Sequence, residues 1–493
     1  MFDVFIIGGG PAGAAAGRLL ASWGRSVQIA HRPAGSRTSL AESLPPSTRK
    51  LLAFLGLVDA VDAAGFHPNR GNIAFWGSRS RTTNSDAAGL HVSRAQLDEV
   101  LRGCARAAGA GIVGAVVRRV EMSDHVRVDY VTADGRAQTC RARYILDCSG
   151  RAGVVARRGW RQTERRYRTL AIAAEWESDD WATEEAAHTI VESYRDGWAW
   201  SVPLSATQRQ FTVMVEPHRP RFSARSASSV LNEIYTRELA KPRGLSARVS
   251  IARQTGAPWA CDASLYHAPR AAEGCALLVG DAASFIEPLS SAGVKKALTS
   301  AWRAAVVVNT CLARPEMAGA AMDFYDGRER EVYEDCRRLS NAFFREAAAA
   351  YDDPFWSARS DGDENEQRGS IGASDAELAR DPRVRAAFDR LRRSALVRLR
   401  PDPLLRVEAA ATIEGREVVM RDALVLSRAE PPVRFAAGVN LPALVDIASR
   451  RDEVPDILAA YEAEIGPAPM HGLLTGLSLL VARRALIPED SAL

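Results

Sequence analysis

The N-terminal segment constrains the fold of this chain more than any other part of the sequence. An apolar run at residues 2–7 predicts a buried strand, and the glycine-rich segment 8–13 (GGGPAG) follows it directly. An alanine-rich stretch then predicts a helix, and residues 26–30 predict a second strand. This order indicates a βαβ unit that binds a dinucleotide. The carboxylate that commonly binds a ribose hydroxyl is missing, because its position falls on Ala30 or His31.

The positions of the glycine motif have separate physical roles in such a unit. Gly8 permits the tight turn, Gly10 lets the backbone approach a pyrophosphate, and Gly13 lets the helix pack closely on the sheet. Ala12 lies in the first helical turn, where free backbone amides and the helix dipole attract phosphate. The motif therefore predicts cofactor contacts at all four residues.

Two later segments carry polar groups suited to a flavin dinucleotide. On a predicted helix, Arg94 and Asp98 lie four positions apart and share one face. The segment 280–293 (GDAASFIEPLSSAG) follows a buried strand, so the Asp281 carboxylate can accept from ribitol hydroxyls. The amides at Gly293 open a predicted helix and can face a flavin ring. The cofactor-binding candidates in these segments are Arg94, Gly280, Asp281, Pro288 and Gly293.

Together, these motifs resemble the p-hydroxybenzoate-hydroxylase-like superfamily of FAD-dependent flavoproteins. Segment 144–150 (YILDCSG) is also similar to the strand and turn that return to the flavin domain in that superfamily. The resemblance implies an α/β fold, with a Rossmann-type FAD domain interleaved with an antiparallel β-sheet substrate domain, and O2 chemistry on the flavin. The implied boundaries are a monooxygenase module at 1–350, FAD-binding parts at about 1–168 and 262–350, and a substrate sheet at about 70–92 and 169–261.

Two shorter motifs are similar to those of flavin-dependent tryptophan halogenases. The letters GWAWSVP, which include Trp198 and Trp200, resemble their GWxWxIP signature. The letters AESLP, which include Glu42 and Ser43, resemble their GE-S/T segment. The resemblance implies that Glu42 and Ser43 bind the cofactor and that the two tryptophans lie at the substrate. Without it, tryptophans at alternate strand positions simply share one face of a core sheet.

The catalytic groups of those halogenases are absent at the matching positions. The halogenases use an essential lysine to present hypohalous acid, and the register of the predicted strand 72–76 puts Arg70 in its place. A guanidinium cannot give up a proton as an amine does. Ser290 and Ala292 stand where the glutamate and threonine of the halogenase PLESTG segment stand. We therefore expect a relative that hydroxylates, with Arg70 either stabilising a reactive oxygen group or a phenolate, or lying on the surface.

The C-terminal quarter of the sequence has a different pattern. A polar, acidic stretch at residues 357–375 predicts a linker or mobile loop. Residues 376–493 predict a small, mainly α-helical domain, with a hairpin at about 411–426 before three helices. The spacing of its last helices is similar to winged-helix domains that bind precursor peptides by strand addition. A plain helical cap is the alternative.

A peptide-binding domain would make the target an aromatic residue within a polypeptide. Halogenase-like flavoproteins without the lysine occur in tryptophylquinone cofactor biogenesis, and the chain resembles the flavoprotein monooxygenases of that process most. The resemblance implies hydroxylation of tryptophan in a precursor polypeptide, alone or in complex with another maturation enzyme. The arginine-rich stretch 157–168 either receives an acidic peptide or is a solvated face.

Three other functions stay open on the sequence alone. They are a hydroxylase or halogenase of a small aromatic metabolite, a flavin-bearing peptide-binding protein, and a reductase with saturation chemistry like that of geranylgeranyl reductases. Because no second dinucleotide motif is visible, the reductant is either NAD(P)H or reduced flavin from a separate flavin reductase.

Composition excludes several classes of protein. A net charge of +4 gives no reason to expect nucleic acid, and the seven cysteines lack the spacing of a zinc site or a disulfide framework. We expect no metal, no transmembrane segment and a cytoplasmic location, because the chain lacks a long apolar run and begins with a strand instead of a signal peptide. Any mechanism that needs a lysine has four candidates, Lys50, Lys241, Lys295 and Lys296.

Overall fold

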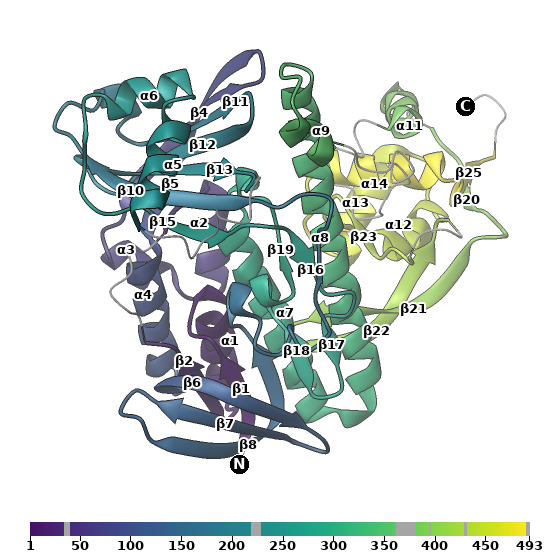
Figure 1. Ribbon diagram of the computed structural model, residues 1–493. Coiled ribbons are helices and arrows are strands. Elements are labelled where there is room, and N and C mark those ends of the chain that lie inside the picture. Colours follow the sequence, from purple (N-terminus) through teal and green to yellow (C-terminus); the bar gives the residue numbers. More distant parts are fainter. Residues whose placement is uncertain (34–39, 218–227, 361–380, 394–395, 428–430, 490–493) are drawn as a thin grey trace. The chain divides into compact units, whose positions relative to one another are not determined.

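The computed structural model describes residues 1–33, 40–217, 228–360, 381–393, 396–427 and 431–489. The chain forms two compact units, Met1–Gly362 and Asp363–Leu493, and each is described by itself. Figure 1 shows their helices and strands with labels. Two large sheets build the first unit, and the second unit has a hydrophobic core of its own.

The first sheet contains the predicted βαβ unit. It has seven strands in the order β1-β2-β6-β7-β8-β18-β17, and β1 also pairs with β8. β1 runs parallel to both β2 and β8, and its residues Val4, Phe5 and Ile6 are 0% exposed. This burial is typical of a parallel strand covered on both faces. The strands are β1 (Phe2–Ile7), β2 (Val27–His31), β6 (Gly111–Met122), β7 (Val126–Thr132), β8 (Ala137–Asp147), β17 (Ala272–Glu273) and β18 (Ala276–Leu278).

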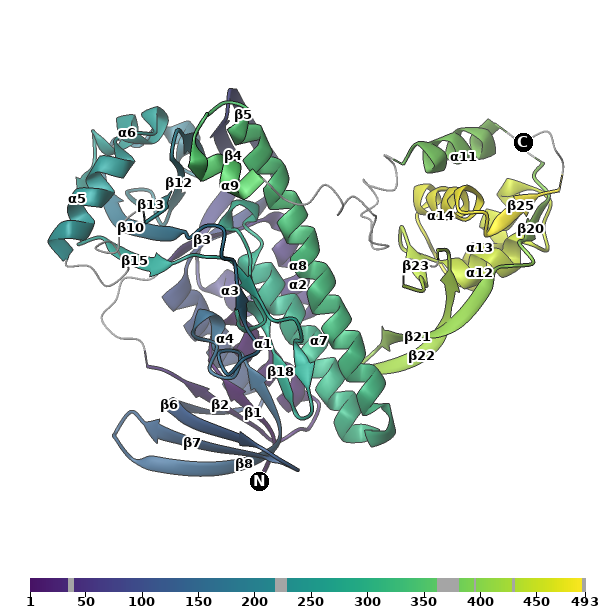
Figure 2. The same cartoon turned by 45° about the vertical axis from the view of Figure 1, so that its right-hand side comes forward.

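Four helices accompany this sheet. α1 follows the glycine turn and contacts both α4 and α7, and α8 lies beside α7 in Figures 1 and 2. The long helical region predicted from residue 293 onward consists of two helices, because α7 ends at Ala313 and α8 begins at Ala318. Pro315 explains the break, since proline lacks an amide hydrogen and its ring clashes with the preceding turn. The helices are α1 (Pro11–Ser22), α4 (Arg94–Ala107), α7 (Gly293–Ala313) and α8 (Ala318–Ala348).

The second sheet is the predicted antiparallel substrate sheet. Eight of its nine strands follow the order β14-β10-β13-β12-β11-β4-β5-β3, and β15 pairs with β10. All neighbours are antiparallel except β11 and β4. The strands are β3 (Ala41–Leu44), β4 (His67–Trp76), β5 (Arg79–Ser93), β10 (Leu170–Glu177), β11 (His188–Tyr194), β12 (Gly197–Pro203), β13 (Gln208–Val215), β14 (Arg253–Gln254) and β15 (Trp259–Asp262).

Strand β3 contains Glu42 and Ser43 of the AESLP segment and stands directly before the helix that begins at Pro46. Its four residues pair with β5, from Ala41 opposite Ser93 to Leu44 opposite Leu90. A segment this short carries too few residues for periodicity to separate a strand from a loop. The helices that follow are α2 (Pro46–Phe54) and α3 (Val58–Ala63).

Alternation along the strands gives the second sheet two different faces. On β12, Trp198, Trp200 and Val202 point to a cavity, whereas Ala199 belongs to the core on the other side. That core includes Tyr235 of α5 and side chains of α6, so these helices cover the second face. The covering helices are α5 (Ser228–Leu239) and α6 (Arg243–Val249).

The end of the first unit corrects the predicted linker at residues 357–375. Residues up to Ser360 belong to helix α9 (Pro354–Ser360), in which Trp356 is 0% and Arg359 is 2% exposed. Two aromatic residues and a buried arginine anchor this helix, which a reading of polar composition alone misses. Residues 361–375 lie outside the described residues. A three-stranded sheet completes the unit, with β9 (Gln162–Thr163), β16 (Tyr266–His267) and β19 (Ser284–Phe285).

The C-terminal unit combines helices with three two-stranded sheets. The predicted hairpin is confirmed, and Gly415 adopts φ 62° at its turn, where glycine meets no steric penalty. The three predicted final helices are also confirmed as α12, α13 and α14. The elements are α11 (Pro382–Arg393), β20 (Leu399–Pro401), β21 (Arg406–Glu414), β22 (Glu417–Val425), β23 (Phe435–Ala436), β24 (Val439–Asn440), α12 (Leu441–Ala448), α13 (Val454–Glu464), α14 (Met470–Ala482) and β25 (Leu486–Pro488).

Because the C-terminal unit has its own core, damage to that core should leave the flavin site intact. Leu477 is 0% exposed within it, so Leu477→Ala should lower the free energy of unfolding of this unit by about 2–5 kcal/mol. Calorimetry should show a transition moved to lower temperature, while the flavin content of the purified protein stays unchanged. Loss of flavin in the variant would contradict the independence of the two units.

Candidate active site

The glycine turn between β1 and α1 is packed too tightly for side chains at two of its positions. A Cβ atom on Gly8, which has φ +106°, would lie 2.2 Å from the Cys148 carbonyl oxygen. A Cβ atom on Gly13 would lie 1.9 Å from the Gly8 carbonyl oxygen. At Gly10 the nearest atom to such a Cβ is the Asp98 Oδ2, at 3.6 Å, which is ordinary van der Waals contact, so a side chain there meets no clash with the protein. The turn thus has the close packing and the free approach that a pyrophosphate needs.

A cavity of about 340 Å³ opens in front of this turn and the N-terminus of α1. The structure brings most of the predicted cofactor residues to its wall, although they come from four separate segments. The unpaired amides at the start of α1 face it with a positive helix dipole. The predicted residues that line it are Gly8, Gly10, Ala12, Glu42, Arg94, Asp281, Pro288 and Gly293, while Gly13 and Gly280 pack behind the wall.

Arg94 ties the second sheet to the cavity wall. Its Nη1 donates to Glu42 Oε1 at 3.1 Å, and its Nε donates to Asp98 Oδ1 at 3.3 Å. Burial opposes the charge on Arg94, but Asp98 and Glu42 outweigh it and hold the pKa of the guanidinium above its ordinary value. Burial also raises the pKa of the Glu42 carboxyl, although Arg94 acts against the change. The guanidinium is therefore a fixed positive charge beside the cofactor cavity.

Asp281 is held at the end of β18 by a buried lysine and a tyrosine. The Nζ of Lys296 lies 3.5 Å from Asp281 Oδ1 and donates to the Gly280 carbonyl at 3.1 Å. The hydroxyl of Tyr266 donates to the Asp281 carbonyl at 2.7 Å. Since the Asp281 side chain remains about 30% exposed, its oxygens can still accept from hydroxyl groups in the cavity.

The end of β2 carries an imidazole where a carboxylate is common. His31 and Arg32 both line the cofactor cavity. Burial lowers the pKa of the His31 ring, and the nearby Arg102 lowers it further. A neutral imidazole at this place can accept one hydrogen bond, as a ribose hydroxyl requires, but it lacks the two acceptor oxygens of a carboxylate.

A second cavity of about 360 Å³ adjoins the first and is largely aromatic and aliphatic. Both cavities share Glu42, Arg94 and Asp281 in their walls. Trp198 and Trp200 line the second cavity with their rings stacked at 4.8 Å and 27°. The structure therefore places the two predicted tryptophans beside the predicted cofactor residues. We refer to this space as the aromatic cavity.

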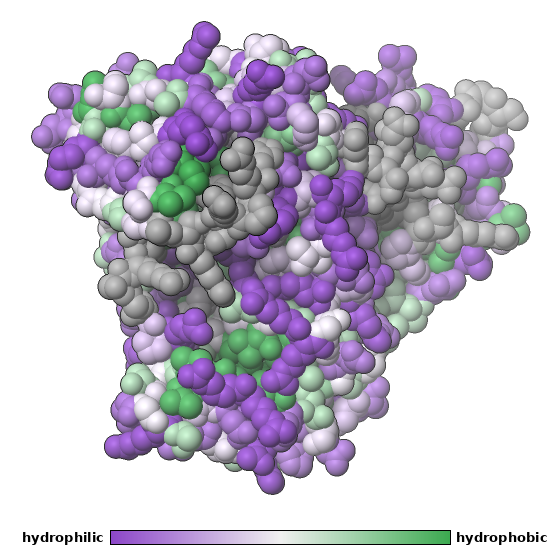
Figure 3. Space-filling view, in the orientation of Figure 1, coloured by the Kyte–Doolittle hydropathy of each residue, from purple (hydrophilic) through white to green (hydrophobic). Residues whose placement is uncertain are grey.

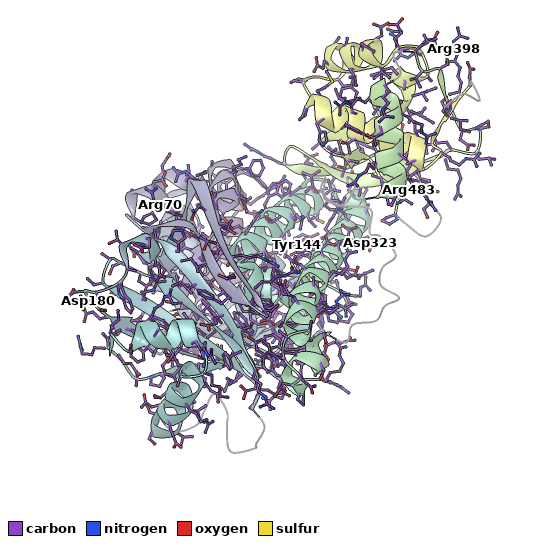
Figure 4. The ribbon with its side chains drawn as sticks, turned by 90° about the horizontal axis from the view of Figure 1, so that it is seen from above. Arg70, Tyr144, Asp180, Asp323, Arg398 and Arg483 are labelled. Atoms are coloured by element: carbon purple, nitrogen blue, oxygen red, sulfur yellow. The ribbon has the colours of Figure 1, made fainter. Side chains whose placement is uncertain are left out.

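Arg70, in contrast, is not brought to the aromatic cavity. It is exposed on β4 among the strands of the substrate sheet (Figure 4), whereas its neighbour Asn69 is 4% exposed. The Nδ2 of Asn69 donates to the Oγ of Ser43, a cavity-lining residue, at 2.7 Å. A bulge or irregularity between Asn69 and Gly71 shifts the register of β4 just before the segment 72–76 from which Arg70 was assigned.

The four lysines all lie among the described residues, and none of them lines the aromatic cavity. Lys50 is exposed on α2, and Lys241 pairs with Asp196 at 2.6 Å. Lys295 donates to Ser47 Oγ at 3.2 Å. Lys296 is buried against backbone carbonyls beneath Asp281. An amine therefore has no direct access to a substrate in the aromatic cavity.

Sequence reasoning missed several polar residues of this cavity. Arg151 Nη1 donates to the Cys261 Sγ at 3.0 Å and to the Asp262 carbonyl at 3.0 Å. Burial opposes the charge on Arg151, but the Cys261 sulfur raises the pKa of the guanidinium above its ordinary value. Thr189 of β11 also lines the cavity. These residues come from unrelated segments and carry no motif, so no signal in the sequence marks them.

Glu287 is a second group that the sequence did not indicate. It is 2% exposed, it lines the cofactor cavity, and its Oε1 has no hydrogen-bond partner among the described residues. Burial raises the pKa of this carboxyl to about 7, and Arg359 acts against the rise. Glu287 directly precedes Pro288, so a group that is half ionised near neutral pH supports the loop between the two cavities.

A sequence profile of the family described as tryptophan halogenase matches residues 78–374, which is more than half of the chain. The chain belongs to the tryptophan halogenase family. Among its relatives, the tryptophan 2-halogenase of Chondromyces crocatus is 29% identical over 376 residues, which are 72% of this chain and 70% of that protein. The flavin-dependent halogenase armH3 of Armillaria mellea is 26% identical over 336 residues, 62% of this chain and 67% of the relative.

Solved structures extend the likeness of this tryptophan halogenase family member to nearly its whole length. CmlS, a flavin-dependent halogenase, has a TM-score of 0.78 at 24% identity, with 99% of this chain and 96% of that chain covered. The peptidyl tryptophan dihydroxylase QhpG, essential for tryptophylquinone cofactor biogenesis, has a TM-score of 0.68 at 21% identity, with 98% of this chain and 99% of that chain covered. At these identities the likeness shows the fold alone.

The comparisons confirm the resemblance to halogenase-like flavoproteins, the fold class and a flavin-dependent enzyme of oxidoreductase type. No helix among the described residues has the length and apolar character needed to span a bilayer. In the same part of the chain, no group of three histidine, cysteine or acidic side chains is placed to hold a metal ion.

The glycine turn of this halogenase-family chain offers a first test of the cofactor site. Gly13→Ala would force a methyl group against the Gly8 carbonyl oxygen, so FAD affinity should fall at least about tenfold. Titration of the apoprotein with FAD measures this loss. Gly103→Ala on α4 is the matched control, because a Cβ there meets nothing within 4 Å. Equal affinity in both variants would remove the turn from the cofactor site.

The raised pKa of Glu287 predicts that the stability of the protein falls as pH rises through neutrality. The unfolded chain ionises this carboxyl near 4.5, whereas the native pKa is about 7, so the native state holds the extra proton between these values. The stability contributed by the protonated carboxyl is thus full below 4.5 and is lost as pH rises through 7.

The free energy of unfolding of Glu287→Gln should therefore rise relative to that of the wild type by roughly 1–3 kcal/mol between about pH 5 and pH 8, because the amide stays neutral. Denaturant unfolding at several pH values measures the difference. Glu273→Gln, at an exposed strand residue, is the control and should track the wild type. A difference between Glu287→Gln and wild type that stays constant with pH would show that Glu287 is ionised in the native protein.

Proposed function

We propose that this chain is an FAD-dependent monooxygenase that hydroxylates an aromatic ring, and that its substrate is a tryptophan side chain in a polypeptide. The observation that carries the proposal is an aromatic cavity, adjoining a dinucleotide cavity, whose wall contains no lysine among the described residues. The cavity can hold an aromatic ring, but it lacks the amine that the resemblance to halogenases requires.

The residues present fit FAD. The glycine turn and the N-terminus of α1 suit its pyrophosphate, and Asp281 offers acceptors for ribitol hydroxyls. Arg94 provides a positive charge at the boundary between the two cavities. When bound and reduced, FAD supplies activated oxygen from O2, with electrons from NAD(P)H or from a flavin reductase.

The protein's own part in such a reaction is to position the ring and to exclude water. Trp198 is 2% exposed and its ring stacks on Trp200, which gives a flat aromatic wall on the substrate side. Val191, Val202 and Ala171 make the adjoining wall apolar. A fixed ring orientation in a water-poor cavity is the contribution that oxygen transfer to an electron-rich ring demands.

Halogenation fits the cavity less well. The two guanidinium groups in its wall cannot release a proton and form a neutral nitrogen donor as an amine does. Arg94 is engaged with Glu42 and Asp98, and Arg151 is engaged with Cys261 and a backbone carbonyl. Asn69, the inward residue of β4, carries an amide whose nitrogen is not basic.

Two observations support a polypeptide substrate. The fold matches that of QhpG, which acts on peptidyl tryptophan, over nearly the whole chain. A third cavity, of about 890 Å³, is lined by Arg161 and Arg165 of the arginine-rich stretch and by Arg330 and Arg337 of α8, against two glutamates. Arg161 Nη1 donates to the carbonyl of Arg151, a residue that lines the aromatic cavity, at 3.0 Å. Hydrophilic residues also dominate the face of the molecule in Figure 3.

Halogenation of a small aromatic metabolite is the second candidate. The names of the relatives favour it, since the tryptophan 2-halogenase and the Armillaria protein are both halogenases. The two functions differ in the atom transferred, so the mass of the product separates them.

The decisive experiment gives the FAD-loaded enzyme a choice of products. The enzyme receives a reductant, O2, chloride and bromide, together with a tryptophan-bearing precursor polypeptide or free tryptophan. We expect the polypeptide to gain one or two oxygen atoms in the intact mass spectrum, and the same polypeptide with phenylalanine in place of tryptophan to gain none.

A chlorine or bromine isotope pattern on any product would overturn hydroxylation in favour of the second candidate. Oxygen gain on free tryptophan but not on the polypeptide would overturn the polypeptide substrate and leave hydroxylation in place. Parallel reactions with NAD(P)H alone and with an added flavin reductase identify the source of electrons.

A further inference from the structure

One polar side chain interrupts the apolar wall that strands β10, β11 and β12 give to the aromatic cavity. It belongs to Thr189, which is 3% exposed. Valine has nearly the same shape as threonine, so a hydroxyl at a buried wall position stabilises the protein only if it finds partners. The cavity-lining residues from these three strands are Ala171, Thr189, Val191, Trp198, Trp200 and Val202.

The partner behind the wall is His91 of β5. Its Nε2 lies 3.0 Å from the Thr189 Oγ1, and the ring is 1% exposed. Burial lowers the pKa of the His91 ring to about 3, and the neighbouring His67, Arg209 and His188 act in the same direction. The ring is therefore neutral at physiological pH, with a proton on one nitrogen and a lone pair on the other.

The surroundings of the ring indicate which nitrogen carries the proton. The backbone carbonyl of Pro68 is the acceptor that acts on the His91 ring. Nδ1 itself has no hydrogen-bond partner within geometric limits among the described residues, so the Pro68 carbonyl can reach it only as a longer and weaker contact. A proton on Nδ1 meets that carbonyl and leaves a lone pair on Nε2. The Thr189 hydroxyl then donates its hydrogen to Nε2 and keeps its own lone pairs, and the residue lines the cavity.

We propose that Thr189, oriented by His91, accepts a hydrogen bond from the substrate ring, so that the aromatic cavity selects rings bearing an N–H or O–H donor. This inference rests on the proposed function for the use of the cavity and deepens it by naming the substrate class. An indole meets the requirement, whereas a ring without a donor leaves the Thr189 oxygen unsatisfied in an apolar wall.

The test uses two ligands that differ only in the ring donor. N-acetyltryptophanamide and its 1-methyl derivative are titrated calorimetrically into the FAD-loaded full chain. Because one neutral hydrogen bond is worth about 0.5–1.5 kcal/mol, the N–H ligand should bind roughly three- to tenfold more tightly. Thr189→Val should remove this preference, and Thr189→Ser should retain it.

A matched variant separates the hydroxyl from general effects on the sheet. Thr212 of β13 lies opposite Trp200, is 0% exposed and does not line the cavity. Thr212→Val makes the same change in the same sheet and should keep the wild-type preference. Nitrogen-15 chemical shifts of His91, assigned with His91→Gln, should show the proton on Nδ1.

Several outcomes would overturn the inference. They are equal binding of the two ligands by the wild type, tighter binding of the 1-methyl ligand, no binding of either, or a preference that persists in Thr189→Val. A proton on Nε2 of His91 would reverse the polarity of Thr189 and count equally against it. The ratio of the two affinities can be measured without turnover. A preference for the N–H ligand without any oxygenated product would therefore refute the proposed function but not the role of Thr189 as a hydrogen-bond acceptor.

Discussion

The ionic cluster of Arg94 with Glu42 and Asp98 is the interaction on which the rest of the site depends. Arg94 begins α4, Asp98 lies one turn further along it, and Glu42 belongs to β3 of the second sheet. The three side chains are only 28%, 23% and 28% exposed. Removing one member of such a cluster leaves a poorly solvated charge, at a cost of about 3–5 kcal/mol when burial is complete. The cluster therefore joins α4 to β3 at a wall that the two cavities share through Glu42 and Arg94.

The parts of the site that the sequence predicts are those in which one local segment contains its own physical reason. Gly13 is required by its contact with the Gly8 carbonyl, five residues earlier, and Trp198 and Trp200 share a face by strand alternation alone. Arg70 was assigned from the register of strand 72–76 against the halogenase strand, and local sequence does not reveal the register shift between Asn69 and Gly71. Arg151, Thr189 and Glu287 were unpredictable for another reason. Their roles arise from burial and from partners far along the chain, which only the folded structure defines.

Two hydroxyl groups in the aromatic cavity are held with opposite polarity. The amide of Asn69 is oriented by the Gly71 N–H, which donates to its Oδ1 at 2.9 Å, so its Nδ2 donates to the Ser43 oxygen and leaves the Ser43 hydrogen free. Thr189 gives its hydrogen to His91 under the inference above and keeps its acceptor lone pairs. Each hydroxyl has a hydrogen-bond partner behind the wall. This partner limits rotation of the hydroxyl hydrogen, which would otherwise let either group act as donor or acceptor. A wall with one fixed donor and one fixed acceptor can orient a ring more closely than shape alone.

Asn69 also shows why shared fold and different chemistry are compatible in this family. An amine in its place would bring a strongly hydrated positive charge to a position that is 4% exposed, with Ser43 as its neighbour. Such a charge requires an anion or water in the cavity, and either would compete with the apolar wall around Trp200. The neutral amide has both ends bonded within the protein and makes no such demand. The same fold carries a halogenase such as CmlS, so the chemistry of the site depends on its side chains and not on the fold.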